Sequence, residues 1–204
     1  MKQIVKNPEP TAFIEWKSKW ETPPGWAEFD GTSMKQQVKS ALLEEQGYLC
    51  CFCESRVGVN SGHIAHLFDR CNHPDLVLSY KNLLYSCREN PRGEPQTCGH
   101  SQGNKILPIS PLDDGCETSF AYSEDGYIHG KDNSARDTIH ILNLNGSNRL
   151  RESRRKVYEE ICDNQDTLSP DEFARWITSE LNRQSDGMFK EYWTTKKYAA
   201  GLYT

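Results

Sequence analysis

Three features typical of membrane, secreted and nucleic-acid-binding proteins are missing from this chain of 204 residues. No apolar run approaches the length of a membrane-spanning helix, and residues 1–6 lack the apolar core of a secretion signal. Lysines and arginines number 24 against 29 aspartates and glutamates, so the net charge is −5 and there is no general basic excess. We therefore expect a cytoplasmic protein in which any contact with nucleic acid comes from a local patch or from a partner.

Cysteine, by contrast, is abundant and concentrated in one stretch. Six of the eight cysteines and four of the six histidines lie between residues 50 and 104. In a reducing compartment such cysteines are metal ligands or free thiols rather than disulfides. Four thiolates form a closed tetrahedral zinc site, which stabilises structure. Cys51 competes with Cys50 as the first ligand, and only the two-residue spacing to Cys53 favours Cys50. The predicted zinc ligands are Cys50, Cys53, Cys87 and Cys98.

Three polar residues are interleaved with the cysteines, in the order His66, Asn82 and His100. An imidazole can activate water, and amide and imidazole groups can hold a hydrolytic metal ion, so this set is typical of a nuclease centre. On a strand, His63 would share a face with Ala65 and lie opposite His66. His63 is either a metal ligand or phosphate contact, or a structural residue, and the sequence leaves both alternatives open.

The motifs in this stretch resemble the HNH (ββα-metal) endonuclease family. The matching segments are Ala65-His66, Asn82-Leu83-Leu84-Tyr85-Ser86-Cys87 and Cys98-Gly99-His100. Downstream, the segment Thr138-Ile139-His140-Ile141-Leu142-Asn143-Leu144-Asn145, with Leu150 and Arg154, is similar to the HNH component of Septu-type antiphage systems, also found with some retrons. The resemblance covers about residues 45 to 160.

This resemblance implies a metal-dependent endonuclease subunit that hydrolyses phosphodiester bonds of DNA or RNA in antiphage defence. It makes His66 the general base, and Asn82 a residue that binds or orients either the metal or His66. It makes His100 a ligand of a catalytic Mg²⁺ or Mn²⁺, which is separate from the structural zinc. The implied partners are nucleic acid, a companion ATPase and, in the retron setting, a reverse transcriptase with its non-coding DNA. The aromatic segments near both ends of the chain are candidate docking faces for the ATPase.

The implied fold is α+β, with a zinc-stabilised ββα-metal core between flanking helices. Local patterns predict helices over residues 12–19, 33–45, 135–142 and 148–163, another starting at Pro170, and a hairpin within 106–130. The expected domains are an N-terminal helical segment (1–46), the zinc-bound HNH nuclease core (47–130) and a C-terminal helical region (131–204).

The helix predicted over 148–163 carries a basic run whose only acid is Glu152. The run is either a phosphate-binding face or a solvated helix paired with acids elsewhere, and the sequence leaves both alternatives open. Its basic residues are Arg149, Arg151, Arg154, Arg155 and Lys156.

Ala65 is where the chain departs from the family pattern. The residue before the catalytic histidine is normally acidic and gives Mg²⁺ or Mn²⁺ a hard oxygen ligand. Ala65 has no ligand atom, so either another group such as His63 or Asp69 replaces it, or metal binding is impaired, as an engineered substitution would also achieve. The alternative function is therefore a catalytically silent, zinc-stabilised binding or interaction module.

Overall fold

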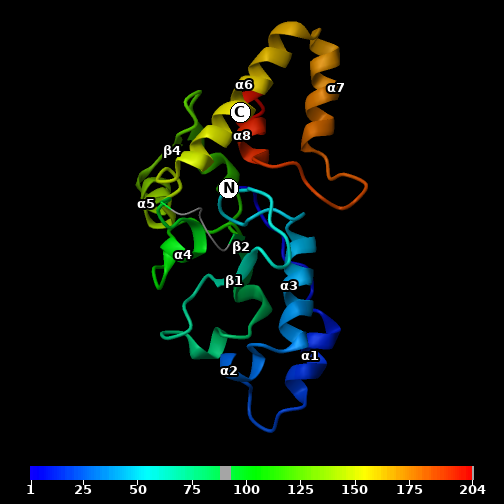
Figure 1. The fold of residues 1–204 in the computed structure, drawn as a ribbon, viewed down its shortest axis with the longest axis vertical. Helices are drawn as coiled ribbons and strands as arrows, with labels where there is room; N and C mark the ends of the chain where they lie inside the picture. The colour runs from blue at the N-terminus through cyan, green and yellow to red at the C-terminus, as the bar shows by residue number, and fades with distance from the viewer. Residues whose placement is uncertain (88–92, 204) are drawn as a thin grey trace.

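The computed structural model describes residues 1–87 and 93–203 (Figure 1). In this part of the chain the fold is α+β, as predicted, and none of its helices is both long and apolar enough to cross a membrane. The described helices are α1 (Thr11–Ser18), α2 (Trp26–Phe29), α3 (Ser33–Glu45), α4 (Cys98–Gln102), α5 (Asn133–Leu142), α6 (Asn148–Thr167), α7 (Pro170–Leu181) and α8 (Trp193–Ala199). The strands are β1 (Gly62–His66), β2 (Leu83–Cys87), β3 (Phe120–Tyr122) and β4 (Ile128–Gly130).

Four of the eight described helices begin where the sequence offers a capping side chain. Thr32 accepts a hydrogen bond from Lys35 N at the start of α3, and Asp132 and Ser147 do the same for α5 and α6. At α7, Ser169 and Glu172 form a reciprocal capping box ahead of Pro170. Each cap satisfies backbone N–H groups that have no partner within the helix. The bounds of the helices confirm those predicted, although α1 has no side-chain cap and α6 runs beyond the expected end.

The centre of the fold is an antiparallel pair of strands with a short helix beside it. Strand β1 pairs with β2 so that Gly62 lies opposite Cys87 and His66 opposite Leu83. Helix α4 contacts β2, and β3 pairs separately with β4 to form the hairpin predicted within 106–130. The β1–β2 pair therefore brings residues on both sides of the long 67–82 connection into register.

One apolar core unites most of the chain. It includes Phe13 and Phe29 from the N-terminal helices, residues of both sheets, and buried residues of α5 and the start of α6. A second, smaller cluster forms around Ile161, Ile177 and Ala200, between α6, α7 and α8. Figure 1 shows why the clusters are separate: α6 leads away from the body of the fold and α7 returns beside it. The proposed three-part division of the chain stays a prediction.

A buried carboxylate ties distant segments to the centre. Glu54 is 4% exposed and has a left-handed backbone conformation, φ 61°. Its side chain accepts hydrogen bonds from Lys2 N at 2.9 Å and Thr194 N at 2.8 Å. The segments around residues 2 and 194 therefore meet next to the cysteine-rich loop.

Candidate metal centre and catalytic site

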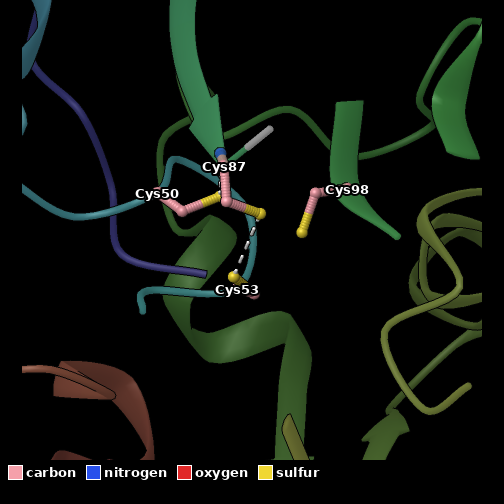
Figure 2. A group of neighbouring side chains, drawn as sticks. All are labelled: Cys50, Cys53, Cys87 and Cys98. Atoms are coloured by element: carbon pink, nitrogen blue, oxygen red, sulfur yellow. Dashed lines mark hydrogen bonds between the residues drawn. The ribbon is translucent and has the colours of Figure 1, made fainter. Parts of the chain in front are cut away.

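The four predicted zinc ligands come together from three parts of the chain. Cys50 and Cys53 lie in the loop after α3, Cys87 ends β2, and Cys98 begins α4. Their sulfur atoms all lie within 4.8 Å of one another, and Figure 2 shows them converging on a common centre. Tetrahedral zinc with Zn–S bonds of about 2.3 Å places sulfurs roughly 3.8 Å apart, and Cys53 Sγ lies 3.9 Å from Cys87 Sγ. The geometry of the cluster therefore fits a zinc ion.

Local hydrogen bonds favour the thiolate form at Cys50, whereas its contacts with Cys87 and Cys98 raise the pKa of those two thiols. The backbone N–H of Cys87 donates to Cys50 Sγ at 3.3 Å, and Ser55 Oγ lies 3.0 Å from Cys53 Sγ. Burial opposes ionisation of Cys50, but hydrogen bonds from neighbouring thiols, Cys51 first, outweigh it and hold its pKa well below the ordinary value. Burial raises the pKa of Cys51, which lies outside the group of four. The structure thus favours Cys50 over Cys51 as the ligand.

The two faces of β1 carry different candidates. His63 and Ala65 share one face and His66 lies on the other, because side chains alternate along a strand. On the first face, the rings of His63 and His100 lie 4.3 Å apart between centroids. Gly99 permits this approach, since a Cβ there would lie 2.7 Å from His63 Nε2. The structure therefore brings His63 and His100 together as a pair of imidazoles.

His66 lies in a largely buried site with a fixed ring. Its Nε2 is 3.0 Å from the carbonyl oxygen of Val77, so that nitrogen carries the proton and Nδ1 keeps the basic lone pair. The Trp26 ring packs edge-on at 5.0 Å between centroids. Burial first, and then the positive charge of Arg70, lower the pKa of His66 to about 4. The imidazole is consequently neutral at neutral pH and can accept a proton.

Asn82 holds the connection that carries Val77. Its Oδ1 accepts from Phe68 N at 2.8 Å, and its Nδ2 donates to the carbonyls of Phe68 at 3.0 Å and Leu76 at 3.1 Å. The amide is buried, and its oxygen already has a backbone partner. These bonds favour an orienting role over direct metal ligation: Asn82 fixes the connection, and the Val77 carbonyl in that connection orients the His66 ring.

Neither Ala65 nor Asp69 supplies the missing carboxylate ligand in this arrangement. Ala65 is 5% exposed. Asp69 accepts hydrogen bonds from the backbone of Cys71 and Asn72 and from the Asn72 side chain, so its carboxylate closes a turn. In the described part of the chain, the four cysteines are the one group of three or more His, Cys, Asp or Glu residues close enough to share an ion. His63 is therefore the better placed of the two proposed replacements.

Trp26 and Arg70 act on His66, and Lys35 contacts the same Trp26 ring, yet none of the three was among the predicted site residues. Trp26 comes from α2, far earlier in the chain. Its ring has Arg70 Cζ at 4.7 Å and Lys35 Nζ at 5.1 Å from the centroid. Two cations therefore lie against the Trp26 ring, which itself packs against His66. Arg70, a basic residue shortly after the histidine, was the one available sequence signal.

The basic run in α6 has mostly internal partners. Arg154 is 1% exposed, and its guanidinium donates to the carbonyls of Gly126 at 2.7 Å and Leu144 at 3.0 Å. Arg155 pairs with two acids of its own helix, and Arg151 bonds to the Tyr127 hydroxyl. These contacts argue against a phosphate-binding face, and they also differ from the solvated-helix alternative, because Arg154 is buried and the acids paired with Arg155 belong to α6 itself.

Comparison with known proteins gives two relatives, while a scan of protein-family models finds no match. The chain is 26% identical over 155 residues to "Retron Vc95 putative HNH endonuclease" of Vibrio cholerae serotype O1 biovar El Tor. The aligned region covers 71% of this chain and 75% of that protein. It is 30% identical over 118 residues to "Septu protein PtuB" of Bacillus thuringiensis, and this aligned region covers 57% of this chain and 44% of that protein. The match thus spans less than half the length of the second relative.

Proposed function

We propose that this chain is a nuclease that cuts phosphodiester bonds in antiphage defence. Its two relatives assign it to the HNH, Septu- and retron-associated family, as the motifs predicted. One observation carries the proposal: the neutral ring of half-buried His66 is fixed by the Val77 carbonyl and lies close to the positive charge of Arg70. In this proposal β1, β2 and α4 are the ββα-metal core, with the cysteine cluster holding a structural zinc at its base.

His66 acts as the general base. Its Nδ1 lone pair takes a proton from water, while the Val77 carbonyl keeps Nε2–H in place and prevents rotation of the ring. Asn82 maintains this geometry by tying the connection around Phe68 and Leu76. Because its pKa is lowered, His66 stays unprotonated over the whole neutral pH range and is available as a base there.

Binding of the phosphate falls to the other groups around the site. Arg70, held against Trp26, offsets the negative charge of the nucleic-acid backbone, whereas Lys35 on the same ring is paired with Asp30. His63 and His100 are the side chains that would hold the catalytic divalent ion, which when bound stabilises the charge developing on the phosphate. Two imidazoles suit Mn²⁺, Co²⁺ or Ni²⁺ better than Mg²⁺, which prefers oxygen ligands.

A second function, binding without catalysis, is favoured by one observation. The described residues contain no second group of three His, Cys, Asp or Glu side chains that could share an ion, and Ala65 supplies no oxygen. On that alternative the zinc-stabilised fold presents surfaces to partners and does not cut. In either function we propose, from the family resemblance, that the chain works with a companion ATPase, and in a retron setting with a reverse transcriptase and its DNA. The names of its relatives refer to Septu and retron systems.

The two functions are separated by a cleavage experiment. Purified chain is incubated with plasmid DNA or RNA and either Mg²⁺ or Mn²⁺, beside its Ala65→Glu and His66→Ala variants. The nuclease proposal expects slow, Mn²⁺-dependent cutting that Ala65→Glu accelerates and His66→Ala abolishes. No cutting by any variant, including Ala65→Glu with the companion ATPase added, would leave the binding module as the function.

A further inference from the structure

An apolar groove lies on the arm formed by α6 and α7, away from the residues of the proposed catalytic site. It has a volume of about 570 Å³ and is formed by the end of α6, one side of α7 and the segment after α8. Figure 1 shows α7 at the edge of the molecule, returning beside α6. The apolar residues that line it are Leu168, Phe173, Ala174, Ile177, Ala200 and Leu202.

The apolar side of α7 is only partly covered within the chain. Ile177 is buried in the small second cluster, but Ala174 is exposed and Leu202 is 46% exposed. The groove volume lies within the roughly 300–1,000 Å³ of protein binding sites. One side of α7 lines the groove together with the end of α6, and amphipathic helices bind in such helix-lined grooves through side chains repeating at helical spacing.

The surroundings of the groove carry negative charge. Asp166 and Asp171 adjoin lining residues in sequence, both are exposed, and neither forms an ion pair in the described part of the chain. Between residues 157 and 175 the one basic residue is Arg175, which follows Ala174 on α7, against six acids. The acids of this segment are Glu159, Glu160, Asp163, Asp166, Asp171 and Glu172. A partner that fills the groove gains from positive charge at its rim, and an acidic partner is repelled.

We propose that this groove binds an amphipathic helix of a partner protein, with apolar residues along one side and lysines or arginines flanking them. The occupant follows from the combination of an apolar floor and an acidic rim. The inference goes beyond the nuclease proposal, because no groove residue is among those assigned to metal, base or phosphate.

The test uses a synthetic helical peptide with a leucine stripe and flanking lysines, labelled for fluorescence anisotropy. A matched peptide replaces every lysine with glutamate. We expect the lysine peptide to bind the full chain, more weakly as salt is raised, and the glutamate peptide not to bind. Replacing Asp166 and Asp171 together with asparagine should weaken binding by about threefold to tenfold, since each exposed charge pair contributes modestly.

A pair of matched variants separates the groove from the general acidity of the arm. Ala174→Gln places a polar amide in the groove without changing charge and should weaken binding by about tenfold or more. Ser179→Gln makes a similar change on the opposite side of α7 and should leave binding unchanged. Zinc content and circular dichroism confirm that both variants are folded.

Three results would overturn the inference: equal binding of the two peptides, unchanged binding by Ala174→Gln, or self-association of the chain that Ala174→Gln abolishes. The last result would make a second copy of the chain the occupant. Peptide binding by a chain that cuts no nucleic acid would sustain this inference while the nuclease proposal failed, so the two are tested separately.

Discussion

Replacing Ala65 with glutamate tests how this chain holds its catalytic ion. Ala65 is 5% exposed and lies two residues after His63 on the same face of β1. Side chains two residues apart on a strand are about 6.6 Å from each other, and the His63 ring is already packed 4.3 Å from that of His100. A carboxylate introduced at position 65 can therefore join the two imidazoles as a third, anionic ligand.

The size of the effect follows from this burial. Without an ion, a buried carboxylate lacking a cation partner lowers stability by several kcal/mol. If the loss is about 2–3 kcal/mol, a chain of this size should lose about 5–10 °C in Tm. A divalent ion at about 100 times its Kd restores about 2.7 kcal/mol. We therefore expect Ala65→Glu to be destabilised in chelator and to recover most of its Tm when Mn²⁺ or Mg²⁺ is added.

Thermal unfolding followed by circular dichroism measures this response, with plasmid cleavage alongside. The matched control is Ala65→Gln, which has nearly the same shape but no charge, and which should lose stability with little recovery on adding metal. The chain as written should respond weakly to Mg²⁺. Two results would refute the reasoning: the same Tm for Ala65→Glu with and without ion, or equal Mg²⁺-dependent cutting by the chain as written and by that variant.

Four further predictions follow from the described contacts. Cys87→Ser should lose both zinc, measured by elemental analysis, and the folded state, because structural zinc binding is coupled to folding; a folded, zinc-free variant would contradict this. Trp26→Ala should raise the His66 pKa from about 4 toward about 6.5 in an NMR titration, because burial is the main cause of its low value. In the unsubstituted chain the low folded-state pKa of His66 makes its contribution to stability complete above about pH 6.5 and lost toward pH 4, a difference on the order of 3 kcal/mol. Urea unfolding at both pH values should show this difference, and Trp26→Ala should reduce it. Asn82→Ala should lower the free energy of unfolding by about 2–3 kcal/mol, because Phe68 N–H and its other backbone partners lose their bonds; unchanged urea unfolding would refute it. Arg70→Ala should weaken oligonucleotide binding and reduce its salt slope by about 1, whereas Arg175→Ala, an exposed arginine on α7, should not.

The parts of the site that could be predicted from sequence are those set by short spacing. The two-residue interval between Cys50 and Cys53 brings both thiols to one side of a tight loop, and the structure gathers them with Cys87 and Cys98. Helix starts were also predictable, because a cap such as Ser169 before Pro170 acts within a few residues.

Other parts depend on contacts between distant segments, which no local pattern encodes. Trp26 gave no sign that it would pack on His66, since the two meet only when α2 folds against the 67–82 connection. The ββα resemblance implies a helix in the core, but no local pattern placed α4, because it is short and contains Gly99, a poor helix former that is needed here for the close approach to His63. The sequence left the basic run in α6 as either a phosphate-binding face or a solvated helix, and neither alternative foresaw that tertiary packing would bury Arg154.

The buried Glu54 carboxylate has a consequence for the order in which the chain folds. Its partners lie 52 and 140 positions away, at Lys2 and Thr194, and contacts across such long loops form slowly because closing the loop costs entropy. On the ribosome the last cysteine of the cluster, Cys98, emerges well before Thr194 does. We therefore expect the nascent chain to capture its metal first and to join residues 2 and 194 to the finished centre last.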